Sequence, residues 1–217
     1  MSIILDDITA WDKFPNSRWM LDKLYVQQKM GYDCGPLGVE PSKYPVWVKP
    51  VINLYGMGIK SRLMHNKESM YYEPGMMWTQ YYTGDHMSYD ITYENNGISS
   101  VYAAKGLNGP NFTEWQVDKI KPNDTLKYLV YRLSIAGQLP QHFNIETIGG
   151  KLIECHPRWS EEFIHYYNEC PFTQKVLWSE NIEEELPMSW VDCRDDSANQ
   201  IIGKLKRIGY TYKFKEK

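Results

Sequence analysis

Residues 143–158 constrain the fold more than any other stretch of this chain. Two short runs that alternate apolar and polar residues flank Gly149-Gly150, a pattern that predicts a β-hairpin. The second run continues into Glu154, His156 and Arg158, which strand alternation places on one side of the sheet. A carboxylate and an imidazole side by side can hold a divalent cation, and an arginine beyond them can hold a phosphate.

The length of the hairpin loop decides which polar side chains share that side. A strict two-residue turn would place Asn144 and Glu146 on the face opposite to Glu154. A three-residue loop with a glycine bulge would pair Asn144 with Glu154. Glu146 and His156 would then lie on the same face. We expect the three-residue loop, and therefore four polar side chains together; the open alternative is an ordinary amphipathic hairpin with a solvated polar face.

Composition excludes several classes of protein. The 217 residues include 42% hydrophobic and 24% charged residues, which is typical of a globular chain with one domain or two subdomains. A net charge of −3 gives no reason to expect general binding of nucleic acid. The four cysteines show no CxxC spacing, which argues against a zinc site or a disulfide framework. We find no signal-peptide pattern and no membrane-spanning run, and expect a cytoplasmic protein.

Two lysines lie in the first third of the chain, in contexts that suggest anion binding. A helix is predicted over residues 17–30, with Lys23 on its exposed side. A buried-type strand over residues 44–51 carries Lys49, which needs an anionic partner among aliphatic neighbours. Gly56-Met57-Gly58 follows, and such a loop can bring backbone N–H groups against phosphates, although many loops contain this pattern.

The remaining elements are predicted from periodicity and turn signals. Residues 1–15 are expected to form a short strand and a loop. Strands over 76–82, 86–93 and 98–104 form an antiparallel meander, in which Asn95-Asn96-Gly97 makes a hairpin turn. Further helices are predicted from Asn123 or Asp124 to Gly137, over 161–169, and from Ser197 to Gly209.

The order of these pieces resembles the ATP-grasp superfamily. The matching segments are the helix with Lys23 and then YPVWVKP, GMG, TQYYTGDHMSYD and IECHPR. The resemblance covers roughly residues 16–168. The resemblance implies an α+β fold of two α+β subdomains with antiparallel sheets and a nucleotide cleft between them. Residues 1–78 would form the N-terminal subdomain and 79–168 the C-terminal one. Residues 169–217 would add a helix and a basic, aromatic tail packed on the core.

The resemblance also implies contacts to ATP. Lys23 and Lys49 would contact the phosphates as point charges, and the backbone of Gly56, Met57 and Gly58 would cover the β- and γ-phosphates. The other implied nucleotide contacts are Gln80, Tyr81 and Tyr82 beside adenine, and Asp85 or His86 near ribose. His86 stands where the family has a glutamate.

The metal site implied by the resemblance departs from the family pattern. Glu154 would bind Mg²⁺, Asn144 would take the place of a carboxylate on the facing strand, and His156 would replace an asparagine. Because Mg²⁺ prefers hard oxygen ligands, Glu146 would have to compensate, or the preference would move towards Mn²⁺. The third alternative is that His156 does not bind metal at all. Arg158 would stabilise the transferring phosphoryl group.

The implied activity is that of an ADP-forming ligase. Such an enzyme converts a carboxylate into an acylphosphate, which an amine or another nucleophile then attacks, and the protein mainly positions and neutralises charge. The alternatives are a catalytically degenerate nucleotide-binding or interaction module and an unrelated α+β domain. The expected partners are a small carboxylate substrate or a protein partner that supplies the substrate domain that many family members carry. A dimer is the further alternative.

Overall fold

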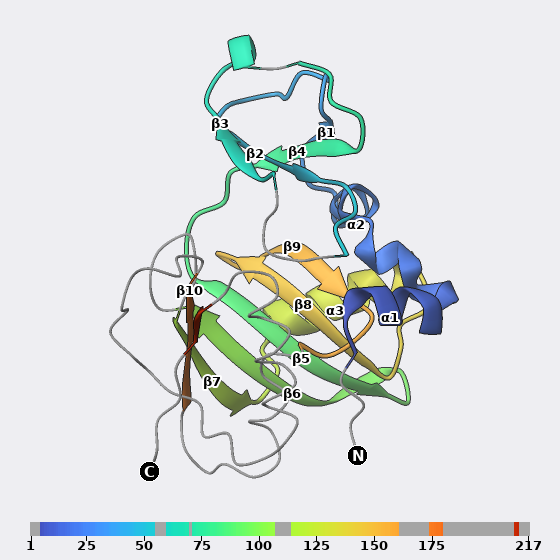
Figure 1. Ribbon diagram of the computed structural model, residues 1–217. Coiled ribbons are helices and arrows are strands. Elements are labelled where there is room, and N and C mark those ends of the chain that lie inside the picture. The colour runs from blue at the N-terminus through green and yellow to red at the C-terminus, as the bar shows by residue number, and fades with distance from the viewer. Residues whose placement is uncertain are drawn as a thin grey trace.

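The described chain contains two antiparallel β-sheets, of four and seven strands, together with helices (Figure 1). The computed structural model describes residues 5–54, 60–69, 71–106, 114–160, 174–179 and 211–212. In chain order the elements are α1 (Asp7–Lys13), the 3₁₀ helix η1 (Pro15–Leu21), α2 (Lys23–Met30), β1 (Cys34–Pro36), β2 (Val46–Pro50), β3 (Arg62–Met64), the 3₁₀ helix η2 (Lys67–Ser69), β4 (Met76–Gln80), β5 (His86–Glu94), β6 (Gly97–Gly106), β7 (Glu114–Ile120), α3 (Asp124–Ala136), β8 (His142–Ile148), β9 (Lys151–His156), β10 (Gln174–Ser179) and β11 (Thr211–Tyr212).

The N-terminal region is helical, so the strand predicted within residues 1–15 is wrong for the part described. Asp6 caps α1, because its carboxylate accepts a hydrogen bond from the N–H of Thr9 at 2.7 Å. The single helix predicted over 17–30 is two helices, η1 and α2, separated at Asp22. The Asp22 carboxylate accepts from the N–H of Tyr25 at 2.9 Å and thereby starts α2.

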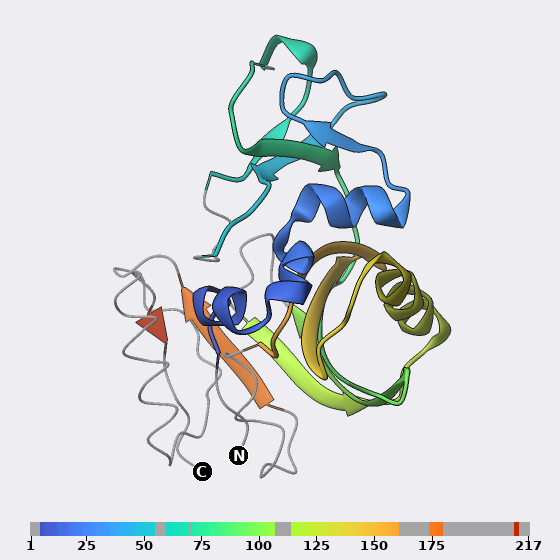
Figure 2. The same ribbon diagram turned by 90° about the vertical axis from the view of Figure 1, so that its right-hand side faces the viewer.

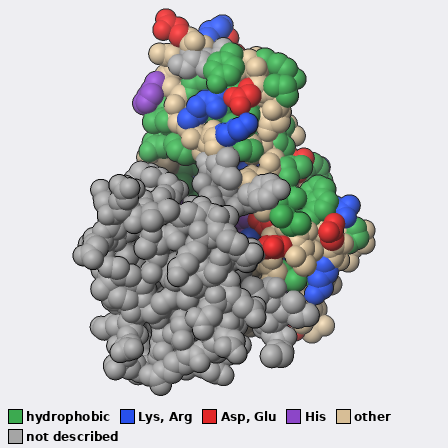
Figure 3. All heavy atoms as spheres, in the orientation of Figure 1, with side chains coloured by type: hydrophobic (Ala, Val, Ile, Leu, Met, Phe, Trp, Pro, Cys, Tyr) green, Lys and Arg blue, Asp and Glu red, His purple; other side chains and the backbone are tan. Residues whose placement is uncertain are grey.

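The smaller sheet has the strand order β1-β4-β2-β3 and contains the predicted lysine strand. Val46 and Val48 are fully buried and point into a core with Trp78. Because side chains alternate along β2, Lys49 lies on the other face of this sheet. Over the smaller sheet, hydrophobic, basic and acidic side chains are interspersed (Figure 3).

The larger sheet has the strand order β11-β10-β7-β6-β5-β8-β9. The predicted meander of β4, β5 and β6 is only partly right, because β4 belongs to the smaller sheet. The hairpin between β5 and β6 is confirmed, since Asn95 and Asn96 both have positive φ at its turn. Strand β7, which pattern reasoning left unassigned, extends this sheet on the other side of β6.

Helix α3 covers one face of the larger sheet, and its predicted apolar stripe is confirmed. Asn123 caps the helix by accepting a hydrogen bond from the N–H of Leu126 at 2.8 Å. The core under the helix contains, from α3 and the sheet, Leu126, Leu129, Val130, Leu133, Ile91, Val101, Phe143 and Ile145. This leaves the opposite face of β5, β8 and β9 for polar side chains.

Helix α2 lies where the two sheets meet (Figures 1 and 2). Its fully buried Gln27 joins them, because its amide nitrogen donates to the carbonyl oxygen of Leu152 in β9 and its amide oxygen accepts from Thr79 Oγ1 in β4 at 3.1 Å. These contacts hold the smaller sheet beside β9, the edge strand of the larger sheet.

Several predictions lie outside the described residues. They concern the Gly56-Met57-Gly58 loop and the helices over 161–169 and 197–209; of the tail, only β11 is described. The expected subdomain boundary at residue 78 lies inside β4 and stays a prediction. No helix in the described part of the chain is long and apolar enough to cross a membrane.

Candidate functional site

The hairpin of residues 143–158 groups the expected polar side chains, but by a different register. Its turn has two residues, since Ile148 pairs with Lys151, so the predicted three-residue loop is wrong. A bulge follows in β9, because Leu152 pairs with Thr147 and Glu154 pairs with Glu146. Ile153 between them has no partner residue in β8. Glu146 therefore lies opposite Glu154, and Asn144 opposite His156. The four polar residues share one face, as predicted, and this face is turned away from α3.

The bulge at Ile153 also creates a contact between the two sheets. A bulged residue is left out of the strand ladder, so its carbonyl oxygen is available to other donors. Lys49 Nζ donates to the Ile153 carbonyl at 2.6 Å and lies 3.9 Å from Glu154 Oε1. The lysine of the smaller sheet therefore reaches the polar face of the larger sheet.

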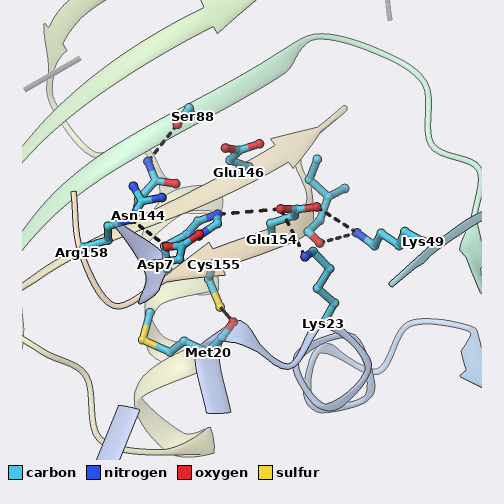
Figure 4. A network of polar contacts seen from close by, with 12 residues as sticks. Asp7, Met20, Lys23, Lys49, Ser88, Asn144, Glu146, Glu154, Cys155 and Arg158 are labelled. Atoms are coloured by element: carbon cyan, nitrogen blue, oxygen red, sulfur yellow. Dashed lines mark hydrogen bonds and ion pairs between the residues drawn. The ribbon is translucent and has the colours of Figure 1, made fainter. Parts of the chain in front are cut away.

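Lys23 meets the same carboxylate from helix α2. Its Nζ lies 3.6 Å from Glu154 Oε2, on the other oxygen from Lys49 (Figure 4). The prediction that Lys23 lies on an exposed helix face is wrong, because the residue is only 5% exposed. The two lysines, from different elements, converge on Glu154.

Burial disfavours the charged form of Lys49. Loss of water around the ammonium lowers the pKa of Lys49 to about 8, with Glu154 acting to raise it and the nearby Lys23 to lower it further. One carboxylate shared by two ammonium groups leaves an excess of positive charge. An anion with several oxygens would relieve that excess.

Asp7 is a member of the site that sequence reasoning missed. It is the first residue of α1 and is 3% exposed. Both of its oxygens lie 3.0 Å from His156 Nδ1, and Oδ1 accepts from Arg158 Nε at 2.7 Å. The N-cap signal at Asp6 could have indicated the helix, but no local pattern indicates that Asp7 would meet the end of β9.

The three groups of this cluster shift one another's titration. Burial by itself would raise the pKa of Asp7, but the charges and hydrogen bonds of His156 and Arg158 hold it well below its usual range. Burial by itself would lower the pKa of His156, but Asp7 raises it above its ordinary value. Asp7 therefore contacts both His156 and Arg158, the residue expected to contact the phosphoryl group.

Glu146 is paired with the histidine at the start of β5. Its Oε2 lies 2.9 Å from His86 Nε2. Burial favours the neutral acid, but this hydrogen bond and the nearby basic groups bring the pKa of Glu146 down to about 2. His86, expected near ribose, is thus engaged with a residue expected to bind metal.

Asn144 belongs to a separate buried group. Its amide nitrogen donates to Ser88 Oγ at 2.8 Å and to Asp90 Oδ1 at 2.7 Å, and the N–H of Ser160 donates to the same Asp90 oxygen. Asp90 was not predicted as a site residue, although it lies next to Asn144 across the strand pair. This group supports the chain as it leaves β9.

The residues expected beside adenine and ribose lie in and after β4. Gln80 donates through its amide to Asp33 Oδ2 at 2.9 Å, and Tyr81 is 44% exposed beside Trp47. The hydroxyl groups of Tyr82 and Thr79 lie 3.4 Å apart. Asp85 pairs with Lys105 at 2.7 Å on the surface. Their roles at a nucleotide remain predictions.

The side chains expected to hold Mg²⁺ do not form a metal site. Among the described residues, no three carboxylate, imidazole or thiol groups are arranged to bind one metal ion. Glu154 faces two ammonium groups, Glu146 faces His86, and His156 faces Asp7. The donors that a hard cation needs are therefore directed at basic side chains, so the residues do not fit the metal that the resemblance implies.

Comparison with known proteins identifies the fold. No protein-family model matches the chain, and no curated protein matches it in sequence. Among solved structures, a protein assigned to the ATP-grasp superfamily from Archaeoglobus fulgidus superimposes with a TM-score of 0.54 and 12% identity, over 91% of this chain and 64% of that one. This chain has the ATP-grasp fold. The fold class expected from the motifs is confirmed.

Two further ATP-grasp structures match over a shorter region. Carboxyaminoimidazole ribonucleotide synthase from Aspergillus clavatus, complexed with ATP, has a TM-score of 0.54 and 11% identity, over 74% of this chain and 50% of that one. N5-carboxyaminoimidazole synthetase from Staphylococcus aureus, complexed with ADP, has a TM-score of 0.51 and 15% identity, over 73% and 50%. This chain therefore spans between half and 64% of the ATP-grasp proteins compared.

Proposed function

We propose that this chain binds ATP between β2, α2 and β9 and uses it to phosphorylate a carboxylate, which gives an acylphosphate and ADP. An amine or another nucleophile then attacks the acylphosphate and displaces phosphate. The observation that carries the proposal is the convergence of Lys23 and Lys49 on Glu154, at 3.6 and 3.9 Å. Two of the similar structures hold ATP or ADP, which supports a nucleotide as the ligand.

The charge on the lysine pair suits a polyphosphate. Burying an ammonium group without full compensation is unfavourable by several kcal/mol, and Lys23 and Lys49 share a single carboxylate. Phosphate oxygens would supply the missing negative charge. Arg158, which also donates to the carbonyl oxygen of Trp159 at 3.0 Å, would be positioned by Asp7 before the substrate arrives.

Thermal unfolding with and without ATP tests the nucleotide site. At about one hundred times the dissociation constant, ATP should add about 2.7 kcal/mol to the stability of the chain. Lys49→Met should abolish this effect because it removes a phosphate contact. The matched control is Lys127→Met on the exposed surface of α3, where Lys127 pairs only with Asp124 among the contacts described. Equal stabilisation of the Lys49→Met and Lys127→Met variants by ATP would rule out the assignment.

Trapping with hydroxylamine tests the ligase chemistry. Hydroxylamine attacks an acylphosphate at its carbonyl carbon, releases phosphate and leaves a stable hydroxamate. The chain incubated with ATP and pools of amino acids and small carboxylates should form ADP and hydroxamate in equal amounts, and Arg158→Gln should lose both. ATP binding without either product would favour the second candidate function.

That second candidate is a nucleotide-binding module without ligase activity. The pairing of Glu154, Glu146 and His156 with other protein side chains favours it, because the family's phosphoryl transfer would use a metal bound at these positions. The two candidates share the nucleotide site and differ only in turnover.

A further inference from the structure

Each carboxylate that a metal ion would need on the β8–β9 face already has a basic partner. Glu154 Oε1 lies 3.9 Å from Lys49, and its Oε2 lies 3.6 Å from Lys23. Glu146 Oε2 lies 2.9 Å from His86 Nε2. A divalent cation bound here would have to displace these groups, and it would add charge to a region where two ammonium groups share one carboxylate.

Position 156 presents a nitrogen where the metal pattern requires an oxygen. His156 Nδ1 lies 3.0 Å from both oxygens of Asp7, and since a carboxylate only accepts, the imidazole donates from this nitrogen. The other ring nitrogen, Nε2, then lies 3.8 Å from Glu154 Oε2. The ring therefore lies between the carboxylates of Asp7 and Glu154. Because Asp7 belongs to α1, His156 contributes to the contact between α1 and β9.

The lysine pair can take over the role of the metal. Lys23 and Lys49 are both almost completely buried and come from α2 and β2. Gln27 of α2 bonds to Leu152 in β9 and to Thr79 in β4, the strand that pairs with β2. Two ammonium groups carry the same formal charge as one divalent cation, and they lie on both oxygens of one carboxylate. If a polyphosphate replaced the Glu154 carboxylate as the partner of the two lysines, their positive charges would already be positioned to neutralise it.

We propose that the phosphates of a nucleotide bind at this site without a divalent cation, with Lys23 and Lys49 supplying the charge that a metal ion would otherwise supply. This inference rests on the proposed nucleotide site. It assigns a structural role, contact with Asp7, to His156, which stands at the position of a metal ligand in the family pattern.

Calorimetric titration of the full chain with ATP, once in excess Mg²⁺ and once in excess EDTA, tests the inference without any variant. We expect the two dissociation constants to agree within about fivefold. Binding that weakens more than this in EDTA would overturn the inference and leave the proposed nucleotide site standing. No binding under either condition would refute the proposed nucleotide site, and the inference with it.

Two variants sharpen the result. Lys23→Met should weaken ATP binding in EDTA by at least about tenfold, and unchanged binding would contradict the role of the lysine pair. His156→Asn restores the amide oxygen of the family pattern, and Mg²⁺ should then strengthen ATP binding by more than about fivefold. A His156→Asn protein that folds, as judged by thermal unfolding, and still ignores Mg²⁺ would contradict the role assigned to position 156.

Discussion

Asp7 contacts residues that are distant from it in the sequence. It lies 149 positions from His156 in sequence, yet its carboxylate contacts both His156 and Arg158 in a nearly dry environment. An unpaired buried charge is far more unfavourable than a paired one. The integrity of the candidate site therefore depends on one side chain of α1.

Replacing Asp7 should destabilise the protein strongly. Asp7→Ala removes the carboxylate that contacts both His156 and Arg158, and we expect a loss of about 3–5 kcal/mol in the free energy of unfolding. Asp12→Ala on the same helix is the control, because Asp12 has an 80% exposed side chain and a loose 3.9 Å pair with Arg18. Chemical denaturation of both variants measures the difference. Similar losses for both variants would show that the contacts of Asp7 with His156 and Arg158 contribute no more to stability than a surface ion pair does.

Lys49 should give the stability an unusual dependence on pH. Its pKa is about 8 in the folded chain and near 10.5 when unfolded, so between these values the unfolded state binds more protons and stability rises with pH. Relative to Lys49→Met, the wild type should gain about 2–3 kcal/mol between these two pH values. The check is the difference in unfolding free energy at several pH values. A difference that stays constant across this window contradicts the account of Lys49.

At the scale of elements, the β8–β9 hairpin is fastened to the segment that joins the two sheets. The N–H of Gly149 donates to the carbonyl oxygen of Asp85 at 3.0 Å. A Cβ built on Gly84 would lie 2.8 Å from the Cα of Gly149, so the two backbones are in direct contact. The turn that sets the register of the polar face therefore also holds the connection between the sheets.

The two turn glycines should differ in their tolerance of a side chain. Both have positive φ, so alanine at either costs about 1–2 kcal/mol in backbone strain. Gly149→Ala also drives a Cβ into the carbonyl oxygen of Thr83, whereas Gly150→Ala meets only a side-chain methyl of Thr125 at 3.7 Å. Gly149→Ala should therefore be clearly the less stable variant in chemical denaturation. Equal stability of the two variants would mean that the connecting segment moves freely.

The elements show which parts of this protein local sequence determines. Helix α3 follows from its cap and its apolar stripe, and the β5–β6 hairpin follows from Asn95 and Asn96, because both signals act within a few residues. The bulge at Ile153 has no such local signal. It lies where β9 packs against α2 and where the Ile153 carbonyl accepts from Lys49 of β2. Pattern reasoning therefore grouped the correct polar residues on one face and assigned them the wrong register.

The site could be predicted only in part for the same reason. The motifs identified Lys23, Lys49 and Glu154, which the structure does bring together. They did not indicate that basic side chains would engage the expected metal ligands, nor that Asp7 would join them. Those contacts join segments that are far apart in the sequence, so no short motif can indicate them.

At the scale of the whole molecule, Gln27 links the smaller sheet to the larger one. Its side chain is fully buried and bonded to Thr79 and Leu152, which lie in different sheets. Leaving a buried carbonyl without a donor costs about 1–3 kcal/mol. Because Lys49 reaches Glu154 across this same junction, a loosened junction would also weaken the lysine pair.

Hydrogen exchange should detect that loosening. Gln27→Ala is expected to accelerate exchange of backbone amides in β2, β4 and β9, and to lower stability by about 1–3 kcal/mol. Gln28→Ala, one residue further along α2 at an exposed position, should leave exchange unchanged. Identical exchange profiles for both variants would show that the sheets are held together by other contacts.

The central claim is that Lys23, Lys49 and Glu154 mark the binding site for nucleotide phosphates. A crystal structure of this chain with ADP tests it most directly. We predict that phosphate oxygens lie within hydrogen-bonding distance of both lysine Nζ atoms, beside the β9 strand. A nucleotide bound elsewhere, with both lysines still directed only at Glu154, would contradict the account.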